Sequence, residues 1–221
     1  MISMKREQGF TLVELLVSIL LTSIIMGAIY SVYRVQTHSA KVQEYRLEAQ
    51  EYARSVLDIM VREIRNAAYN PLGATLGTNC AGGLPGTPSV VTGTATSIRF
   101  TYDFENTAGT TFTPDGNCNG PDEDITYTYD TTGCAAGFGN VTRNGSANPL
   151  TNCNVTSFDL RYFKQDGTEL SRPVIAAELP NIQRAMITLT VQSLKPDTEF
   201  GGQLNATMTS NADLRNRGLP S

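Results

Sequence analysis

The chain has 221 residues, of which 40% are hydrophobic and 17% are charged, and its formal net charge is −4. This length fits one domain, or one domain with an appendage. The mild acidity argues against nucleic-acid binding by bulk charge, and the apolar content excludes a wholly disordered chain. All ten Pro, all four Cys and 17 of the 19 Gly follow residue 70. We therefore expect a long helix first and a turn-rich part after it.

The N-terminal part of the chain contains one long apolar segment. No charged residue occurs from Leu15 to Val32, and a helix from Phe10 to Tyr33 would be about 36 Å long, enough to cross a bilayer core of about 30 Å. We therefore predict that residues 10–34 are the transmembrane half of the helix. Lys5 and Arg6 precede this segment, so the positive-inside rule predicts a single-pass chain whose C-terminal head lies outside the cytoplasm.

Glu14 places a carboxylate inside this apolar segment, at a cost of several kcal/mol in a membrane. Residues 9–17 read GFTLVELLV, which closely resembles the class III signal of type IV pilins and of type II secretion pseudopilins. The resemblance implies that residues 1–9 are a leader peptide and that a prepilin peptidase cleaves after Gly9 and methylates the amino group of Phe10. It also implies that Glu14 neutralises that amine during assembly, commonly on a neighbouring subunit. Pairing removes most of the cost of two buried charges.

A helical pattern continues beyond the apolar segment. We predict that residues 35–70 are an amphipathic half of the same helix, which extends from Phe10 to Ala68 and ends at Asn70-Pro71 because Pro71 disfavours helix at the preceding residue. Apolar side chains recur at steps of three and four, as expected for one buried helix face, at Val42, Tyr45, Ala49, Tyr52, Val56, Met60 and Ile64.

Residues 71–221 are predicted to form a β-rich head. Alternating apolar and polar residues, with β-branched and aromatic side chains, predict strands near residues 98–102, 125–129, 139–144, 158–162 and 187–191, with a short extra strand at 90–91. The short connections favour antiparallel pairing. The predicted fold class is α+β, with the long helix packed on an antiparallel sheet, which matches the pilin architecture. Residues 141–144, 149–150 and 154–162 resemble the PilW-like minor pilins.

The four cysteines all lie in the predicted exported head, where an even count favours disulfides. Pairing of sequence neighbours would join Cys80 to Cys118 and Cys134 to Cys153. A simple up-and-down sheet instead places Cys118 and Cys153 at one end of the strands and the other two cysteines at the opposite end. On that argument we predict the pairs Cys80–Cys134 and Cys118–Cys153.

An acidic loop precedes the second predicted strand. Its oxygen-bearing side chains at alternate positions are typical of the first half of a calcium-binding loop, but Thr126 occupies the twelfth position, where such loops have glutamate. We interpret the segment as a solvated acidic loop and expect no cofactor, with calcium binding as the alternative. The candidate ligands would be Asp115, Asn117, Asn119, Asp122 and Asp124.

The sequence contains no recognisable catalytic set, because its only histidine, His38, lies on the predicted helix. We expect a non-enzymatic minor pilin that begins in the bacterial inner membrane and takes part in pilus assembly or its initiation, at or near the tip. The bulky loops favour such a position over a repeated shaft. The expected partners are a prepilin peptidase, other minor and major pilins or pseudopilins, the inner-membrane assembly platform and, before assembly, the lipid bilayer. The alternatives are a minor pseudopilin of type II secretion, similar to the J component, and a tip adhesin or DNA-uptake subunit.

Overall fold

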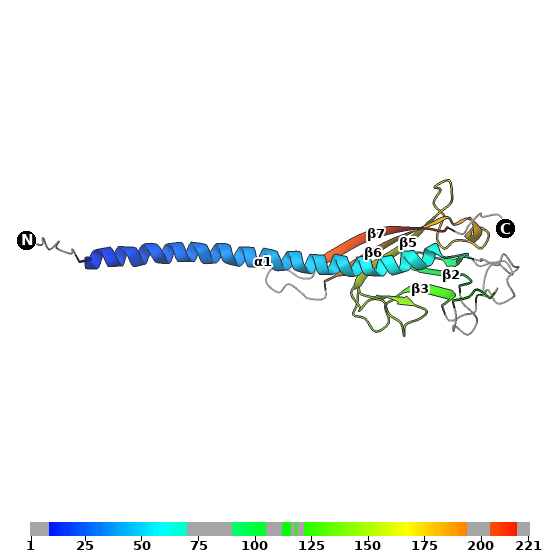
Figure 1. Ribbon diagram of the computed structural model, residues 1–221, viewed down its shortest axis with the longest axis horizontal. Helices are drawn as coiled ribbons and strands as arrows, with labels where there is room; N and C mark the ends of the chain where they lie inside the picture. Colours follow the sequence, from blue (N-terminus) through cyan, green and yellow to red (C-terminus); the bar gives the residue numbers. More distant parts are fainter. Residues whose placement is uncertain are drawn as a thin grey trace, which may run out of the picture. The chain divides into compact units, whose positions relative to one another are not determined.

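The computed structural model describes residues 9–69, 90–104, 112–115, 118, 122–193 and 204–215. The chain divides into two compact units, Met1–Glu44 and Tyr45–Ser221. Helix α1 (Leu12–Arg65) belongs to both units (Figure 1). The first unit contains the N-terminal part of α1, and the second contains the C-terminal part of α1 together with all the described strands.

The end of α1 lies slightly before the predicted boundary. Residues 66–68 form a turn in which Asn66 and Ala67 donate to carbonyls three residues earlier, a tightening that is common at helix ends. Ala68 adopts a positive φ of 66° and donates its N–H to the carbonyl of Thr101 at 3.0 Å. The helix therefore ends at Arg65, before the predicted stop at Asn70-Pro71, because the backbone turns there to form a hydrogen bond with the segment that contains Thr101.

Seven strands in the described residues form two antiparallel sheets. The first sheet has the order β1-β2-β3-β4, with bounds Val90–Gly93, Ser97–Thr101, Asp124–Asp130 and Asn140–Arg143. The second has the order β5-β6-β7, with bounds Val155–Phe163, Arg184–Gln192 and Asn205–Asp213. A short 3₁₀ helix, η1 (Leu179–Asn181), precedes β6. All six strands expected from the sequence are present, and the α+β class with antiparallel strands beside a long helix is confirmed.

The structure differs from the expected single sheet in two ways. The strands divide into two sheets, which are joined between β4 and β5 by an isolated bridge from Gly139 to Val155. Strand β7 was not predicted because its residues are mostly Thr, Ser, Asn and Ala. Its hydroxyl groups pair across to β6, from Thr207 to Thr190 at 2.9 Å and from Thr209 to Thr188 at 3.1 Å.

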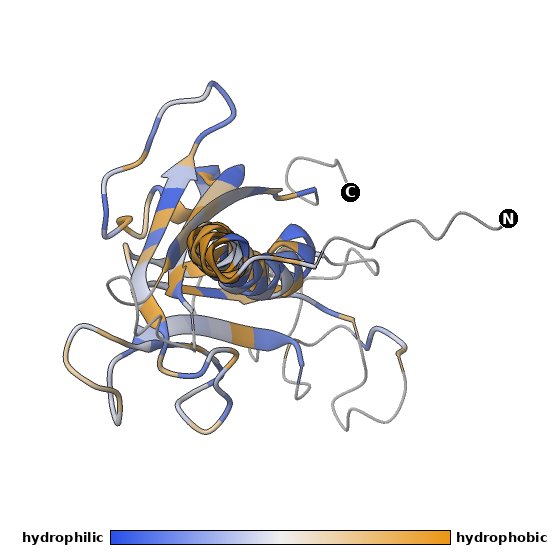
Figure 2. Ribbon diagram, turned by 90° about the vertical axis from the view of Figure 1, so that its left-hand side faces the viewer, coloured by the Kyte–Doolittle hydropathy of each residue, from blue (hydrophilic) through white to orange (hydrophobic). Residues whose placement is uncertain are grey.

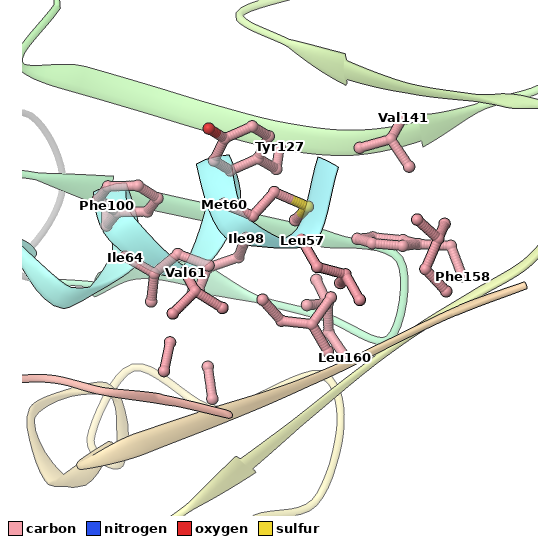
Figure 3. Close-up of a cluster of buried hydrophobic side chains, with 14 of the residues drawn as sticks. Leu57, Met60, Val61, Ile64, Ile98, Phe100, Tyr127, Val141, Phe158 and Leu160 are labelled. Carbon is pink, nitrogen blue, oxygen red and sulfur yellow. The ribbon is translucent and has the colours of Figure 1, made fainter. Parts of the chain in front are cut away.

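The core of the head forms where α1 meets both sheets. Figure 2 shows strands on more than one side of the helix, with hydrophilic and hydrophobic residues alternating along them. In Figure 3 a segment of α1 that carries Leu57, Met60 and Ile64 lies between strands of the two sheets. The buried helix residues are Ala49, Ala53, Val56, Leu57, Met60, Val61 and Ile64. The list contains the predicted stripe from Ala49 onward except Tyr52, which is partly buried against the core. Burial of these apolar side chains is the main force that holds α1 to the head.

Candidate processing and assembly site

The start of α1 is fixed by a reciprocal pair of side chains. The Thr11 hydroxyl accepts a hydrogen bond from the Glu14 N–H at 3.3 Å, and the Glu14 carboxylate accepts one from the Thr11 N–H at 3.3 Å. The Thr11 hydroxyl also donates to the same carboxylate oxygen at 3.2 Å. This arrangement is a capping box, which satisfies backbone N–H groups that have no partner within the helix. Glu14 is therefore held at the helix end where the macrodipole favours negative charge.

The predicted cleavage point lies just outside this capped end. Gly9 and Phe10 are exposed and non-helical, and the Phe10 side chain is 81% exposed. The peptide bond between them is thus accessible to a peptidase in the isolated chain. Only three residues separate Phe10 from Glu14, so an amine created at Phe10 would lie at the same end of the helix as the carboxylate. Residues 1–8 of the predicted leader lie outside the described residues.

The apolar half of α1 is exposed along its whole length. By length and composition, one helix in the described part of the chain could span a membrane, and it is α1. Its apolar side chains from Leu12 to Val35 are between 49% and 76% exposed. A contiguous apolar surface of this size is unusual on a soluble monomer and marks a membrane or protein contact.

Comparison with known sequences finds a motif in the same segment. The model of the prokaryotic N-terminal methylation motif matches residues 4–30, which include Gly9, Phe10 and the capping box. The N-terminal part of the chain therefore matches a prokaryotic N-terminal methylation motif. Among solved structures, the type IV-like pilin TTHA1219 from Thermus thermophilus matches with a TM-score of 0.45 and 11% sequence identity, over 75% of this chain and 95% of that one. No curated protein matches the chain.

The predicted disulfide pairs are wrong. Cys134 bonds to Cys153, with Cα atoms 5.3 Å apart and 19 residues of separation. This bond excludes both Cys80–Cys134 and Cys118–Cys153. Cys118 is buried and is also disulfide-bonded, whereas Cys80 lies outside the described residues.

The reason is an extra reversal of the chain after β4. The Arg143 N–H donates to the Asn148 carbonyl, and the Leu150 N–H donates to the Val141 carbonyl at 2.7 Å. The chain therefore runs back beside β4 before it enters β5, which returns Cys153 to the end of the sheet where Cys134 lies. Asn140 supports this arrangement, because its side-chain carbonyl accepts the Cys153 N–H. The up-and-down argument lacked this return segment.

The acidic residues of the calcium hypothesis have other partners in the described part of the chain. Asp124 accepts two hydrogen bonds from the Arg99 guanidinium, at 2.8 and 2.5 Å, and Asp122 accepts one from Arg143 at 2.8 Å. Asp115 is described, but Asn117 and Asn119 lie outside the described residues. Within the described ranges, no group of three or more His, Cys, Asp or Glu could hold a metal ion. Calcium binding remains an untested hypothesis.

A polar cluster between α1 and β3 was not found from the sequence. The Tyr127 hydroxyl donates to the Glu63 carboxylate at 2.5 Å, and Arg143 donates to the same oxygen at 3.1 Å. Burial, with the nearby Glu63 charge as a second cause, raises the pKa of Tyr127 far above its ordinary value of 10.0. The cluster fixes the last turns of α1 against the first sheet. The position of Glu63 beside Met60 and Ile64 on the helix was the available signal, but its partners come from distant strands.

A shallow pocket of about 550 Å³ lies over the first sheet, on strands β2, β3 and β4. Its lining is polar and includes Arg99, Asp124, Thr126, Thr128 and Thr142. This surface is the feature that would serve the binding alternative.

Proposed function

We propose that this chain is a minor pilin that a prepilin peptidase cleaves after Gly9 and that then assembles into a type IV pilus, at or near the tip. The observation that supports the proposal most strongly is the position of the methylation motif. The motif lies at the capped N-terminal end of α1. The apolar N-terminal half of α1 is exposed, whereas its C-terminal half is buried in a disulfide-bonded head. The apolar half can anchor such a chain in the inner membrane, and the same half can later contact other subunits in place of lipid.

Glu14 has a defined role in this proposal. In the isolated chain its carboxylate accepts hydrogen bonds from Thr11 alone among the described residues. During assembly, the methylated amine of Phe10 on a neighbouring subunit would approach the same carboxylate. Two buried opposite charges gain from pairing, whereas either charge alone is costly in an apolar fibre core. The pairing therefore favours one axial offset at the contact between those two subunits.

Fibre incorporation of Glu14 variants tests this role. Full-length wild type, Glu14→Gln and Glu14→Asp would be expressed in the source cell, and the chain would be quantified in inner membranes and in sheared fibres. We expect Glu14→Gln to reach the membrane normally but to fall at least about ten-fold in fibres, because its amide cannot neutralise an ammonium. Glu14→Asp should retain part of the incorporation. Normal incorporation of Glu14→Gln would contradict the assigned role.

The polar pocket over β2, β3 and β4 favours one second candidate, a tip adhesin or DNA-uptake subunit. Deletion of the gene distinguishes the candidate functions. Loss of pili indicates an assembly role, and loss of adhesion or DNA uptake with intact pili indicates a binding role. Blocked enzyme secretion with intact pili indicates a type II secretion pseudopilin.

A further inference from the structure

The solvent-exposed side of α1 within the head carries two pairs of like charges, which are separated by Arg54 and Asp58. Steps of three, four and seven residues place the two pairs and Asp58 on one side of the helix, away from the buried stripe. Glu48 and Glu51 form an acidic block, and Arg62 and Arg65 form a basic block close to the helix end. We call this surface, which consists of Glu48, Glu51, Asp58, Arg62 and Arg65, the charged face.

The charges of both blocks lack partners in the described part of the chain. None of Glu48, Glu51, Arg62 and Arg65 makes an ion pair or a side-chain hydrogen bond there. Five cations elsewhere in the head behave differently, because each contacts a carboxylate: Arg99, Arg143, Arg161, Lys164 and Arg172. Among the described residues, the head thus pairs these five cations and leaves the charges of both blocks without a partner.

The basic block lies at a recess that can receive a side chain. Arg62, Arg65 and Arg215 line a cavity of about 320 Å³ together with Val61, Asn66 and Asp58. Three guanidinium groups and one carboxylate give the recess a net positive charge. Guanidinium groups bind carboxylates through two parallel hydrogen bonds, so the recess suits a carboxylate ligand.

The sequence spacing between the glutamates and the arginines of the charged face indicates which partner fits it. Arg62 follows Glu48 by fourteen residues, and Arg65 follows Glu51 by the same number. A shift of fourteen residues is about 21 Å along a helix. A second copy in the same orientation and shifted by this amount would place both of its glutamates opposite both arginines. We propose that a second copy of this chain docks on the charged face, with its Glu48 and Glu51 at Arg62 and Arg65 of the first copy.

The parallel orientation rests on the proposed function, because two copies inserted in one membrane by the same segment must point the same way. An antiparallel pair would instead join Glu48 to Arg65 and Glu51 to Arg62. The parallel contact uses different patches on the two copies, so it is a heterologous contact.

Zero-length carbodiimide cross-linking tests the register in the full-length chain. It joins carboxylates to amines, so single variants Arg62→Lys and Arg65→Lys supply the amine and keep the charge. We expect links from Lys at 62 to Glu48 and from Lys at 65 to Glu51 in membranes and fibres. Each pair is about 21 Å apart on one helix, so such links must join two copies. Links from Lys at 62 to Glu51 and from Lys at 65 to Glu48, or the absence of a link at both positions, would overturn the proposal.

Charge reversal tests the identity of the partner. The double variants E48R/E51R and R62E/R65E should each reduce fibre incorporation about ten-fold, because like charges then face each other. The chain that combines all four changes should recover to within about two-fold of wild type, because a second copy carries both reversals. Asp166→Arg, on an exposed turn, is the matched control and should have no effect.

Each remaining outcome is decisive. Unchanged incorporation of the double variants, or failure of the combined chain to recover, would exclude a second copy on this face. Absence of wild-type chain from fibres would contradict the proposed function instead, and the cross-links in the membrane fraction would still decide the docking.

Discussion

The two halves of α1 have the same secondary structure but different surroundings. Ile24 in the N-terminal half is 62% exposed, whereas Ile64 in the C-terminal half is fully buried between the sheets. The described residues of the head therefore bury one half of the helix, and the other half has an exposed apolar surface, which is typical of a membrane or protein contact. The comparison shows that one continuous helix can be a core element in one segment and an exposed apolar element in another.

The largest effect expected from this comparison comes from the same substitution in each half. Ile64→Ala should lower the unfolding free energy of the head by about 2–5 kcal/mol, because it leaves a cavity in a packed core. Ile24→Ala should leave that free energy unchanged. Denaturant unfolding of the full-length chain in detergent, followed by tyrosine fluorescence, measures both. Equal effects of the two substitutions would contradict the difference between the two halves of α1.

Removal of the Cys134–Cys153 disulfide tests the head alone. Replacement of both cysteines by serine should destabilise the head by about 3 kcal/mol, since the bond closes a loop of 19 residues. The helix content of the apolar half should not change. Peptide mapping without reductant checks the connectivity itself, and a Cys118–Cys134 peptide would disprove it.

The cluster at Tyr127 tests the junction of α1 with the first sheet. Tyr127→Phe should cost about 1.5–3 kcal/mol, because it removes a hydrogen bond to the charged Glu63. The raised pKa of Tyr127 also predicts a pH dependence. The neutral phenol is favoured in the folded state, so its contribution is complete below pH 10 and is lost as the pH rises above 10. Unfolding measured on either side of pH 10 should show a smaller loss in Tyr127→Phe than in wild type.

The smallest effect concerns the start of the apolar half. Thr11→Ala should cost about 1 kcal/mol of local helix stability, because it removes the cap on the Glu14 N–H. Amide hydrogen exchange near residue 14 should become about five-fold faster. Thr22→Ala is the control, because the Thr22 hydroxyl bonds only the Ser18 carbonyl within the helix. Faster exchange in the control alone would refute the capping role.

The sequence predicted the features that depend on local patterns. The apolar stripe from Ala49 to Ile64 and the alternation at Phe100 and Tyr127 are visible because large apolar side chains contrast with polar neighbours. Strand β7 lacked that contrast, because its two buried residues are Ala206 and Ala212. The strand forms because it pairs with β6, and a contact of this kind between two segments cannot be read from the sequence of β7 alone.

The disulfide and the Glu63 cluster were missed for a related reason. Both depend on how distant segments meet. The disulfide depends on the reversal of the chain near Asn148, and the cluster depends on the packing of α1 against β3 and β4. The site at Gly9, Phe10 and Glu14 was easier to predict because all of its residues lie within six positions. The capping role of Thr11 follows the same local logic, since a threonine three residues before a glutamate is a common helix start.

The N-terminus of the mature chain tests the central claim most directly. Intact-mass and peptide mass spectrometry of the chain purified from cells would identify its first residue and any modification. The account predicts a chain that starts at Phe10 with a methylated amino group, in membranes and in sheared fibres. A chain that retains Met1, or that is cleaved at another bond, would contradict it.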